Sequence, residues 1–211
     1  MMKETAVVQA TEEQALQRAV ESLKAGGLVA FPTDTVYGLA ALAWDETAVV
    51  GLYEAKRRSR EKPIPLLLSD ADRLAQVGHL PGTLDRLAER FWPGGLTLVI
   101  EKQERVPHVV SPGPTVAVRV PDLSLARDVI RRAGGVLAVT SANISGQPSP
   151  VTASEVAQQL EGRIDLILDG GPCPGGVAST ILDSTVSPPA VLRRGAIPVD
   201  ELRAVVGDVS T

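Results

Sequence analysis

The chain has 211 residues, 44% of them hydrophobic and 22% charged, which is ordinary for a globular protein with one well-packed core and at most a small appendage. Its formal net charge of −4 argues against a general nucleic-acid binder, because phosphate contacts normally require a basic surface. The single cysteine, Cys173, excludes an intrachain disulfide and a cysteine-based metal cage, and neither His79 nor His108 is spaced with carboxylates as zinc ligands are.

The first predicted elements are a helix and a short strand. Thr11 and Gln14 have the spacing of a capping box, and apolar residues follow them at helical intervals. Gly26 and Gly27 are expected to end this helix, since glycine accepts the left-handed cap. Leu28–Phe31 is an apolar run closed by proline, and it predicts a buried strand.

The rest of the chain alternates strands and helices. Asp45 is expected to cap a second helix, with Val49, Val50, Leu52 and Tyr53 on its apolar side. Further strands are predicted at Pro65–Leu68, Leu96–Glu101, Thr115–Val120, Val136–Thr140, Ile164–Leu168, Ser179–Asp183 and Val191–Arg193, and further helices at Leu84–Phe91, Leu123–Ala133, Ala153–Leu160 and Val199–Val205. This order predicts a single α/β domain over residues 8–206, built around one sheet, with no second C-terminal domain.

Polar segments that follow predicted strands are candidates for a functional site, because ligands on α/β sheets bind beyond the carboxyl ends of strands. The first is Phe31–Gly38, in which Thr33 and Thr35 flank the carboxylate of Asp34. Such a segment is either a turn that satisfies its own backbone or part of a binding site. The residues alone favour the two equally.

The second candidate is the basic run from Lys56 to Lys62, which holds five cations in seven residues. These cations could clamp a polyphosphate, with arginine giving bidentate contacts and lysine a point charge. Charge density alone favours a solvated helix end, where cations complement the helix dipole. The exit through Lys62-Pro63 into a predicted strand supports the phosphate clamp instead.

Two further candidates complete the set. Thr140–Gly146 offers hydroxyl and amide groups that suit a ribose, an amino group or phosphate oxygens, although such residues are also ordinary turn formers. Arg119 lies inside an apolar strand, where it must either meet an internal carboxylate or receive an anionic ligand. It is considered together with Ser179-Thr180 and Arg193–Gly195.

Taken in order, these runs resemble the YrdC-like family, the threonylcarbamoyl-adenylate synthases that begin threonylcarbamoyl modification of tRNA. The resemblance covers about residues 10 to 205. It rests on eight motifs, namely Pro32–Leu39, Ala55–Arg58 with Lys62-Pro63, Phe91–Thr97, Thr115–Pro121, Ser141–Gly146, Asp169–Gly171, Ser179-Thr180 and Val191–Gly195. Each motif is weak alone, and the ordered set is specific.

The resemblance implies an α/β (α+β) fold, a twisted mixed sheet flanked by helices with a concave basic cavity. It implies a nucleotidyltransferase that forms threonylcarbamoyl-AMP and pyrophosphate from L-threonine, bicarbonate and ATP. Mg²⁺ is expected to accompany the ATP, with Asp34 as a candidate ligand and no other ligand identified. tRNA and downstream threonylcarbamoyl-transferase proteins are the further partners that it suggests.

The resemblance also assigns roles residue by residue. Lys56 and Arg58 are expected to be catalytic, and both are expected to hold the phosphates together with Lys62. The remaining ATP contacts are expected from Thr115, Ser141, Asn143, Ser149 and Arg193, and the threonine contacts from Thr33, Thr35, Tyr37, Arg119, Val139 (through its backbone) and Ser179. The chain departs from the family pattern at Asp34, usually Glu, at Ser59, often Pro, and at Leu67, where many members carry a histidine near threonine.

Three other functions fit parts of the pattern. A YciO-type relative would share the domain and act on a different substrate. A double-stranded RNA or tRNA-binding module would use the basic run, although the net charge and the lack of exposed aromatic residues argue against it. A fragment of a hydrogenase-maturation carbamoyl transferase would ordinarily come with zinc-finger and acylphosphatase segments, which this sequence does not show. No apolar run approaches a membrane span, so we expect a cytoplasmic protein.

Overall fold

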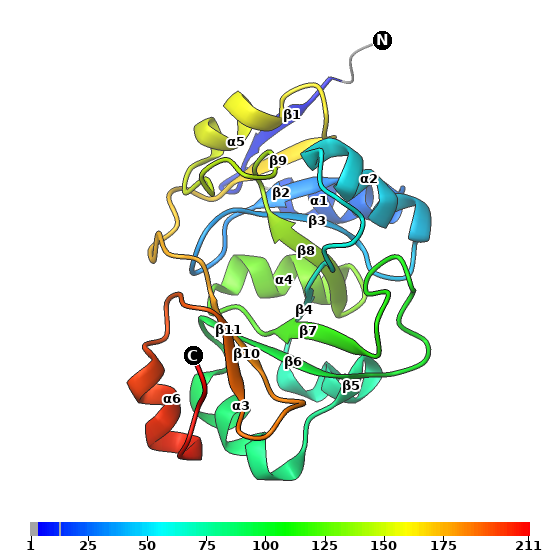
Figure 1. The fold of residues 1–211 in the computed structure, drawn as a ribbon. Helices are drawn as coiled ribbons and strands as arrows, with labels where there is room; N and C mark the ends of the chain where they lie inside the picture. The colour runs from blue at the N-terminus through cyan, green and yellow to red at the C-terminus, as the bar shows by residue number, and fades with distance from the viewer. Residues whose placement is uncertain (1–3, 13) are drawn as a thin grey trace.

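A mixed β-sheet runs through the computed structural model, which describes residues 4–12 and 14–211 (Figure 1). The strand order is β1-β9-β2-β3-β8-β4-β7-β6-β10-β11, and β5 pairs with β6 at the side. The strands are β1 (Ala6–Gln9), β2 (Val29–Phe31), β3 (Gly38–Leu42), β4 (Leu66–Leu68), β5 (Gly78–His79), β6 (Leu96–Lys102), β7 (Thr115–Arg119), β8 (Val136–Ser141), β9 (Leu166–Asp169), β10 (Thr180–Asp183) and β11 (Ala190–Arg193).

Helices cover both faces of this sheet. They are α1 (Ala15–Lys24), α2 (Glu46–Lys56), α3 (Asp85–Phe91), α4 (Ser124–Arg132), α5 (Ala153–Leu160) and α6 (Val199–Val206), with short 3₁₀ turns at Ala71–Gln76 and Gly82–Leu84. Alternate strand residues belong to different core clusters, because successive side chains of a strand point to opposite faces. In β2, for example, Val29 packs with α1 and α4, whereas Ala30 packs with α2 and α5. The predicted fold, a mixed sheet flanked by helices, is confirmed.

The ends of the first two helices test the predicted caps. The capping box at Thr11 is wrong, because α1 begins at Ala15 and Gln14, at the N-cap position, makes no side-chain cap bond. Instead Glu12 turns back, and its Oε1 accepts a hydrogen bond of 3.0 Å from the backbone N of Gln9. The cap at Asp45 is confirmed, since its carboxylate accepts from the backbone N of Ala48 at 3.0 Å.

Three strands were not predicted from the sequence, namely β1, β3 and the two-residue β5. β3 has the sequence Gly-Leu-Ala-Ala-Leu, which lacks the β-branched and aromatic residues typical of strands. It forms because it is buried between β2 and β8, with which it pairs antiparallel. β1 is a sheet edge whose parallel partner, β9, lies about 160 residues away along the chain, as the pairing of Ala6 with Leu166 shows.

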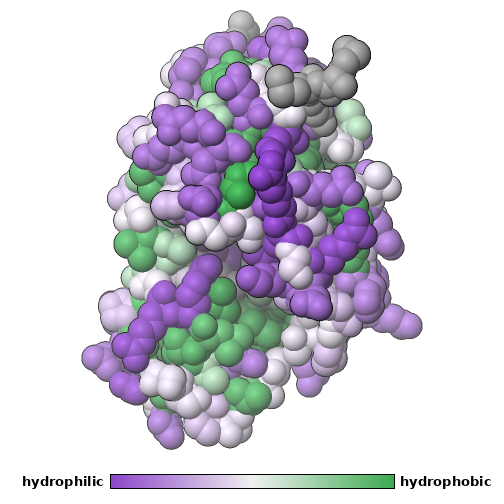
Figure 2. All heavy atoms as spheres, turned by 45° about the horizontal axis from the view of Figure 1, so that its top comes forward, coloured by the Kyte–Doolittle hydropathy of each residue, from purple (hydrophilic) through white to green (hydrophobic). Residues whose placement is uncertain are grey.

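Four strands in the lower half of the view in Figure 1 lie beneath a concave face of the molecule. β7, β6, β10 and β11 lie side by side, with β6 antiparallel to β7 and parallel to β10. A surface view shows a hollow near the middle of one face, between polar side chains above and an apolar patch below (Figure 2). None of the helices in the described ranges has the length and apolar character needed to cross a membrane.

Candidate active site

A cavity of about 400 Å³ opens at the ends of the central strands. The loop before β3 forms one wall, Arg58 after α2 another, and the floor comes from β6, β7, β10 and β11. Most of the predicted site residues line it, namely Thr33, Thr35, Tyr37, Arg58, Thr115, Arg119, Val139, Ser141, Ser149, Ser179 and Arg193. Lys56, Lys62 and Asn143 are not among the lining residues.

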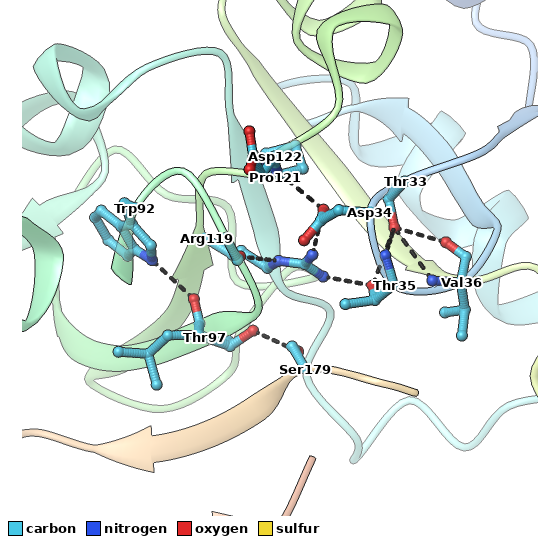
Figure 3. A network of polar contacts seen from close by, with 12 residues as sticks. Thr33, Asp34, Thr35, Val36, Trp92, Thr97, Arg119, Pro121, Asp122 and Ser179 are labelled. Carbon is cyan, nitrogen blue, oxygen red and sulfur yellow. Dashed lines mark hydrogen bonds and ion pairs between the residues drawn. The ribbon is translucent and has the colours of Figure 1, made fainter. Parts of the chain in front are cut away.

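Arg119 is the centre of the polar network in this cavity (Figure 3). Its Nη2 lies 2.6 Å from Oδ1 of Asp34, its Nη1 donates to Oγ1 of Thr35 at 2.9 Å, and its Nε donates to the Gly94 carbonyl at 2.8 Å. Oδ1 of Asp34 also accepts from the backbone N of Asp122 at 3.0 Å. The buried arginine therefore meets an internal carboxylate, which was one of the two alternatives.

The pairing with Asp34 does not use all of the hydrogen-bonding capacity of Arg119. A guanidinium carries five N–H donors, and these three contacts use one donor on each nitrogen. Two donors remain, one on Nη1 and one on Nη2. Because Arg119 lines the cavity, these donors can serve an anionic ligand while the ion pair stays intact.

The loop from Thr33 to Tyr37 is both a self-satisfied turn and a cavity wall. Thr33 Oγ1 donates to the carbonyl of Val36 at 2.7 Å and accepts from the backbone N atoms of Thr35 and Val36 at 3.2 and 3.3 Å. Tyr37 is fully buried, and its hydroxyl donates to the Gly171 carbonyl at 2.8 Å. Burial raises the pKa of Tyr37, and the nearby Asp169 carboxylate raises it further, so this hydroxyl stays protonated.

A glycine-rich segment between β9 and β10 closes over this loop. The backbone N atoms of Gly175 and Gly176 donate to the carbonyls of Asp34 and Thr35 at 3.0 and 2.9 Å. A Cβ at Gly175 would lie only 2.5 Å from the Asp34 carbonyl oxygen, so only glycine allows this approach. The segment thus holds the two residues that contact Arg119.

Lys56 is buried, and its ammonium group is occupied by protein oxygens. Nζ donates to the carbonyl of Ser141, to the carbonyl of Asn143 at 2.6 Å and to Oδ1 of Asn143 at 3.1 Å. Asn143 in turn donates from Nδ2 to the carbonyls of Ile144 and Gln147 at 3.0 and 2.6 Å. The geometry therefore does not support the predicted phosphate contacts of Lys56 and Asn143, and it makes both residues internal supports of the loop after β8.

The burial of Lys56 predicts a pH dependence of stability. Burial, and secondarily repulsion from Arg58, lowers the pKa of Lys56 to about 7, compared with 10.5 for an exposed lysine. Between these values the unfolded chain binds more protons than the folded protein, so the free energy of unfolding should rise as the pH increases from about 7 towards 10.5. Urea denaturation of the wild type and of Lys56→Met at pH 6.5, 8 and 9.5 tests this. The difference between the two proteins should change across this range, and a constant difference would contradict the assignment.

Three arginines give the cavity its positive charge. Nε and Nη2 of Arg58 donate to the carbonyls of Lys62 and Pro63 at 3.2 and 3.0 Å, and Arg193 donates to the Ser179 carbonyl and hydroxyl at 2.8–3.0 Å. Arg58, Arg119 and Arg193 all line the same cavity. Burial lowers the pKa of Arg193, and repulsion from Arg119 and Arg58 lowers it further. Lys62 is exposed and lies outside the lining, so only part of the predicted basic run faces the cavity.

The described residues contain no cluster of three or more metal-ligating side chains. Asp34, the candidate Mg²⁺ ligand, is used by Arg119 and by the backbone N of Asp122, so its geometry does not support that role. Mg²⁺ that accompanies ATP is held largely by phosphate oxygens and waters, and it needs few protein carboxylates.

Several lining residues were not predicted from the sequence. Thr97 lies on β6, and its hydroxyl is 2.8 Å from that of Ser179 (Figure 3). Asp183 and Leu192 line the cavity from β10 and β11, and Leu67 lines it from β4. The alternation of residues along a strand was a usable signal for Asp183, which lies four positions from the predicted Ser179. It gave no signal for Thr97, because no residue of β6 was predicted to contact a substrate.

Comparisons with known proteins identify the family of this chain. A family model described as Sua5_yciO_yrdC, telomere recombination, matches residues 21–195. A threonylcarbamoyl-AMP synthase of Pyrococcus abyssi is 44% identical over 94% of this chain and 59% of the relative, and one of Bacillus subtilis is 41% identical over 94% and 58%. The crystal structure of P. abyssi Sua5 complexed with L-threonine superposes with a TM-score of 0.93 at 42% identity, covering 98% of this chain and 62% of that one. The chain thus spans less than two thirds of each of these relatives.

Proposed function

The chain belongs to the Sua5/YciO/YrdC family, and from this membership and its site we propose that it is an L-threonylcarbamoyladenylate synthase. Such an enzyme joins L-threonine, bicarbonate and ATP to form threonylcarbamoyl-AMP and pyrophosphate. The observation that supports this most is the convergence of Arg58, Arg119 and Arg193 on one cavity, beside the hydroxyls of Thr33 and Thr35. The arginines suit phosphates and a carboxylate, and the hydroxyls suit a small polar amino acid.

In the proposed arrangement, the substrates occupy two ends of the cavity. Arg58 and Arg193 would bind the phosphates, and Lys62, which does not line the cavity, would have to reach them from outside it. Arg119 directs its two unused N–H donors to the threonine carboxylate, while Thr35 and Ser179 contact the rest of that substrate. Ser141 and Ser149, on the loop that Lys56 supports, and Thr115 on β7 contact the nucleotide.

The proposed chemistry needs alignment and charge neutralisation more than acid–base catalysis. The amino nitrogen of threonine, as the free amine, first bonds to the bicarbonate carbon; the C–O bond to the bicarbonate hydroxyl breaks, and this hydroxyl leaves as water with a proton from the amine, which gives the carbamate. A carbamate oxygen then attacks the α-phosphorus, the bond from that phosphorus to the bridging oxygen breaks, and pyrophosphate leaves. Mg²⁺ on the phosphates would neutralise part of the charge that develops. Among the described lining residues there is no histidine, which agrees with a reaction that requires no general base of that kind.

The product would be used to modify tRNA adenosine, which makes tRNA and a threonylcarbamoyl-transferase protein the proposed downstream partners. The formal net charge of −4 favours transfer of the small adenylate over tight binding of tRNA by this chain itself.

The test is pyrophosphate release by the purified protein. With ATP, L-threonine and bicarbonate together we expect release, and mass spectrometry should detect threonylcarbamoyl-AMP. Omitting bicarbonate or replacing L-threonine with L-valine should reduce release to background. Pyrophosphate release at the same rate whichever amino acid is supplied would favour a YciO-type relative with another substrate. The absence of pyrophosphate release under every condition would contradict the proposal.

A further inference from the structure

Asp183 is the only carboxylate among the described residues that line the cavity. Its Oδ1 accepts hydrogen bonds from the backbone N and the Oγ1 of Thr185 at 2.9 and 2.6 Å. No hydrogen bond or ion pair occupies its Oδ2 in the part of the chain that the structure describes. A carboxylate facing a cavity lined by three arginines therefore keeps a free acceptor and bonds to none of them.

The sheet register separates Asp183 from Arg193. Ile181 pairs with Arg193 on β11, so that position of β10 lies beside a side chain that we propose to bind the phosphates. Asp183 is two residues, about 7 Å, further along the same strand and on the same face. Its partner on β6 is Val99, which pairs in turn with Ala117 on β7.

The surroundings of Asp183 suit a flat aromatic ring. Val99, Ala117 and Ile181 form an apolar stretch of the cavity floor, and Leu192, which is 60% exposed, lines the same cavity from β11. A triphosphate would be repelled by Asp183 and attracted by the arginines. If the phosphates bind at the arginines, the nucleobase is the part of the nucleotide that suits the apolar stretch.

We propose that Asp183 selects the nucleobase, with Oδ2 accepting a hydrogen bond from the exocyclic amino group of adenine. This inference rests on the proposed function for the identity of the nucleotide. An ionised carboxylate only accepts hydrogen bonds, so it favours a base with an amino group at this position and disfavours one with a carbonyl oxygen. Thr185 holds the carboxylate by its other oxygen and so fixes the direction of the free one.

The experiment compares the binding of ATP and ITP, which differ in that inosine has a carbonyl where adenine has the amino group. Isothermal titration calorimetry with the full chain and Mg²⁺ should show at least about tenfold tighter binding of ATP by the wild type. Asp183→Asn, whose amide can also donate, should reduce this preference to within about threefold. Thr185→Val is the matched control, because it removes the hydroxyl bond to Asp183 but keeps the backbone N bond that orients the carboxylate, and it should retain most of the preference.

Several results would overturn the inference. Equal binding of ATP and ITP by the wild type is one, and an unchanged preference in Asp183→Asn is another. If Asp183→Asn weakens the binding of both ATP and ITP, and excess Mg²⁺ restores both affinities equally, Asp183 would contact the metal ion instead of the base. Purine riboside triphosphate lacks the exocyclic amino group and should bind the wild type more weakly than ATP does. This comparison needs no variant protein. Selection of ATP through Asp183 without pyrophosphate release would leave the inference standing and contradict the proposed function.

Discussion

Replacing Arg119 with methionine should abolish measurable threonine-dependent pyrophosphate release, with a fall in kcat/KM of at least about 100-fold. The change removes the two free donors proposed for the substrate carboxylate and leaves the Asp34 carboxylate, only 14% exposed, without its cation. Breaking a buried ion pair by removing one partner typically costs about 3–5 kcal/mol, so the free energy of unfolding in urea should fall by that amount. Steady-state kinetics and urea denaturation measure the two effects separately.

Matched variants separate the role of Arg119 in the fold from its role in binding. Asp34→Asn keeps the guanidinium in place, so it should retain measurable threonine binding. The double variant Arg119→Met with Asp34→Asn buries no unpaired charge, so it should recover part of the stability lost by Arg119→Met alone. It should recover none of the activity. If the double variant regained activity, Arg119 would serve the fold alone.

Elements that carry their own local signal are predicted most accurately from the sequence. α5 is predicted with its observed bounds, and Asp45 caps α2 as expected, because periodicity and capping depend on neighbouring residues. β3 was missed because its small residues have little intrinsic preference for strands and its formation depends on its neighbours in the sheet. Local patterns cannot show that Ala6 will pair with Leu166.

In the site, too, local features could be predicted from the sequence and contacts between distant residues could not. The residues alone indicated that Arg119 needs a partner, and the partner proved to be Asp34, 85 residues earlier in the chain. The sequence could not show which cations of the basic run face the cavity, because Lys56 and Arg58 are only two positions apart yet have different surroundings. Arg57, which adopts a left-handed conformation at the end of α2, separates the buried ammonium of Lys56 from the cavity-facing guanidinium of Arg58. Spacing within a motif therefore identified a functional segment without identifying the role of each cation.

Replacing Lys56 with methionine should lower kcat/KM for ATP by about 100-fold, although the side chain does not line the cavity. Methionine fills a similar volume but donates no hydrogen bond, so the carbonyls of Ser141 and Asn143 lose their partner in a buried environment. The loop after β8 should then lose its fixed shape and misplace the Ser141 hydroxyl, which does line the cavity. Steady-state kinetics with varied ATP at saturating threonine should show the main effect in KM for ATP.

Two comparisons decide whether Lys56 positions this loop or only stabilises the fold. Arg60→Met changes an exposed cation of the same basic run, paired with Glu54 at 3.6 Å, and should alter stability by no more than about 0.5 kcal/mol. Lys56→Arg keeps the charge but is too bulky to place a single nitrogen among the three oxygens, so it should not restore the affinity for ATP. A variant at Lys56 that lowers stability while KM for ATP stays at the wild-type value would show that the lysine supports the core alone. A rise in KM for ATP with little change in KM for threonine would place its effect in the nucleotide end of the cavity, because the ammonium donates to Ser141 and Asn143, at the end of β8 and in the loop after it.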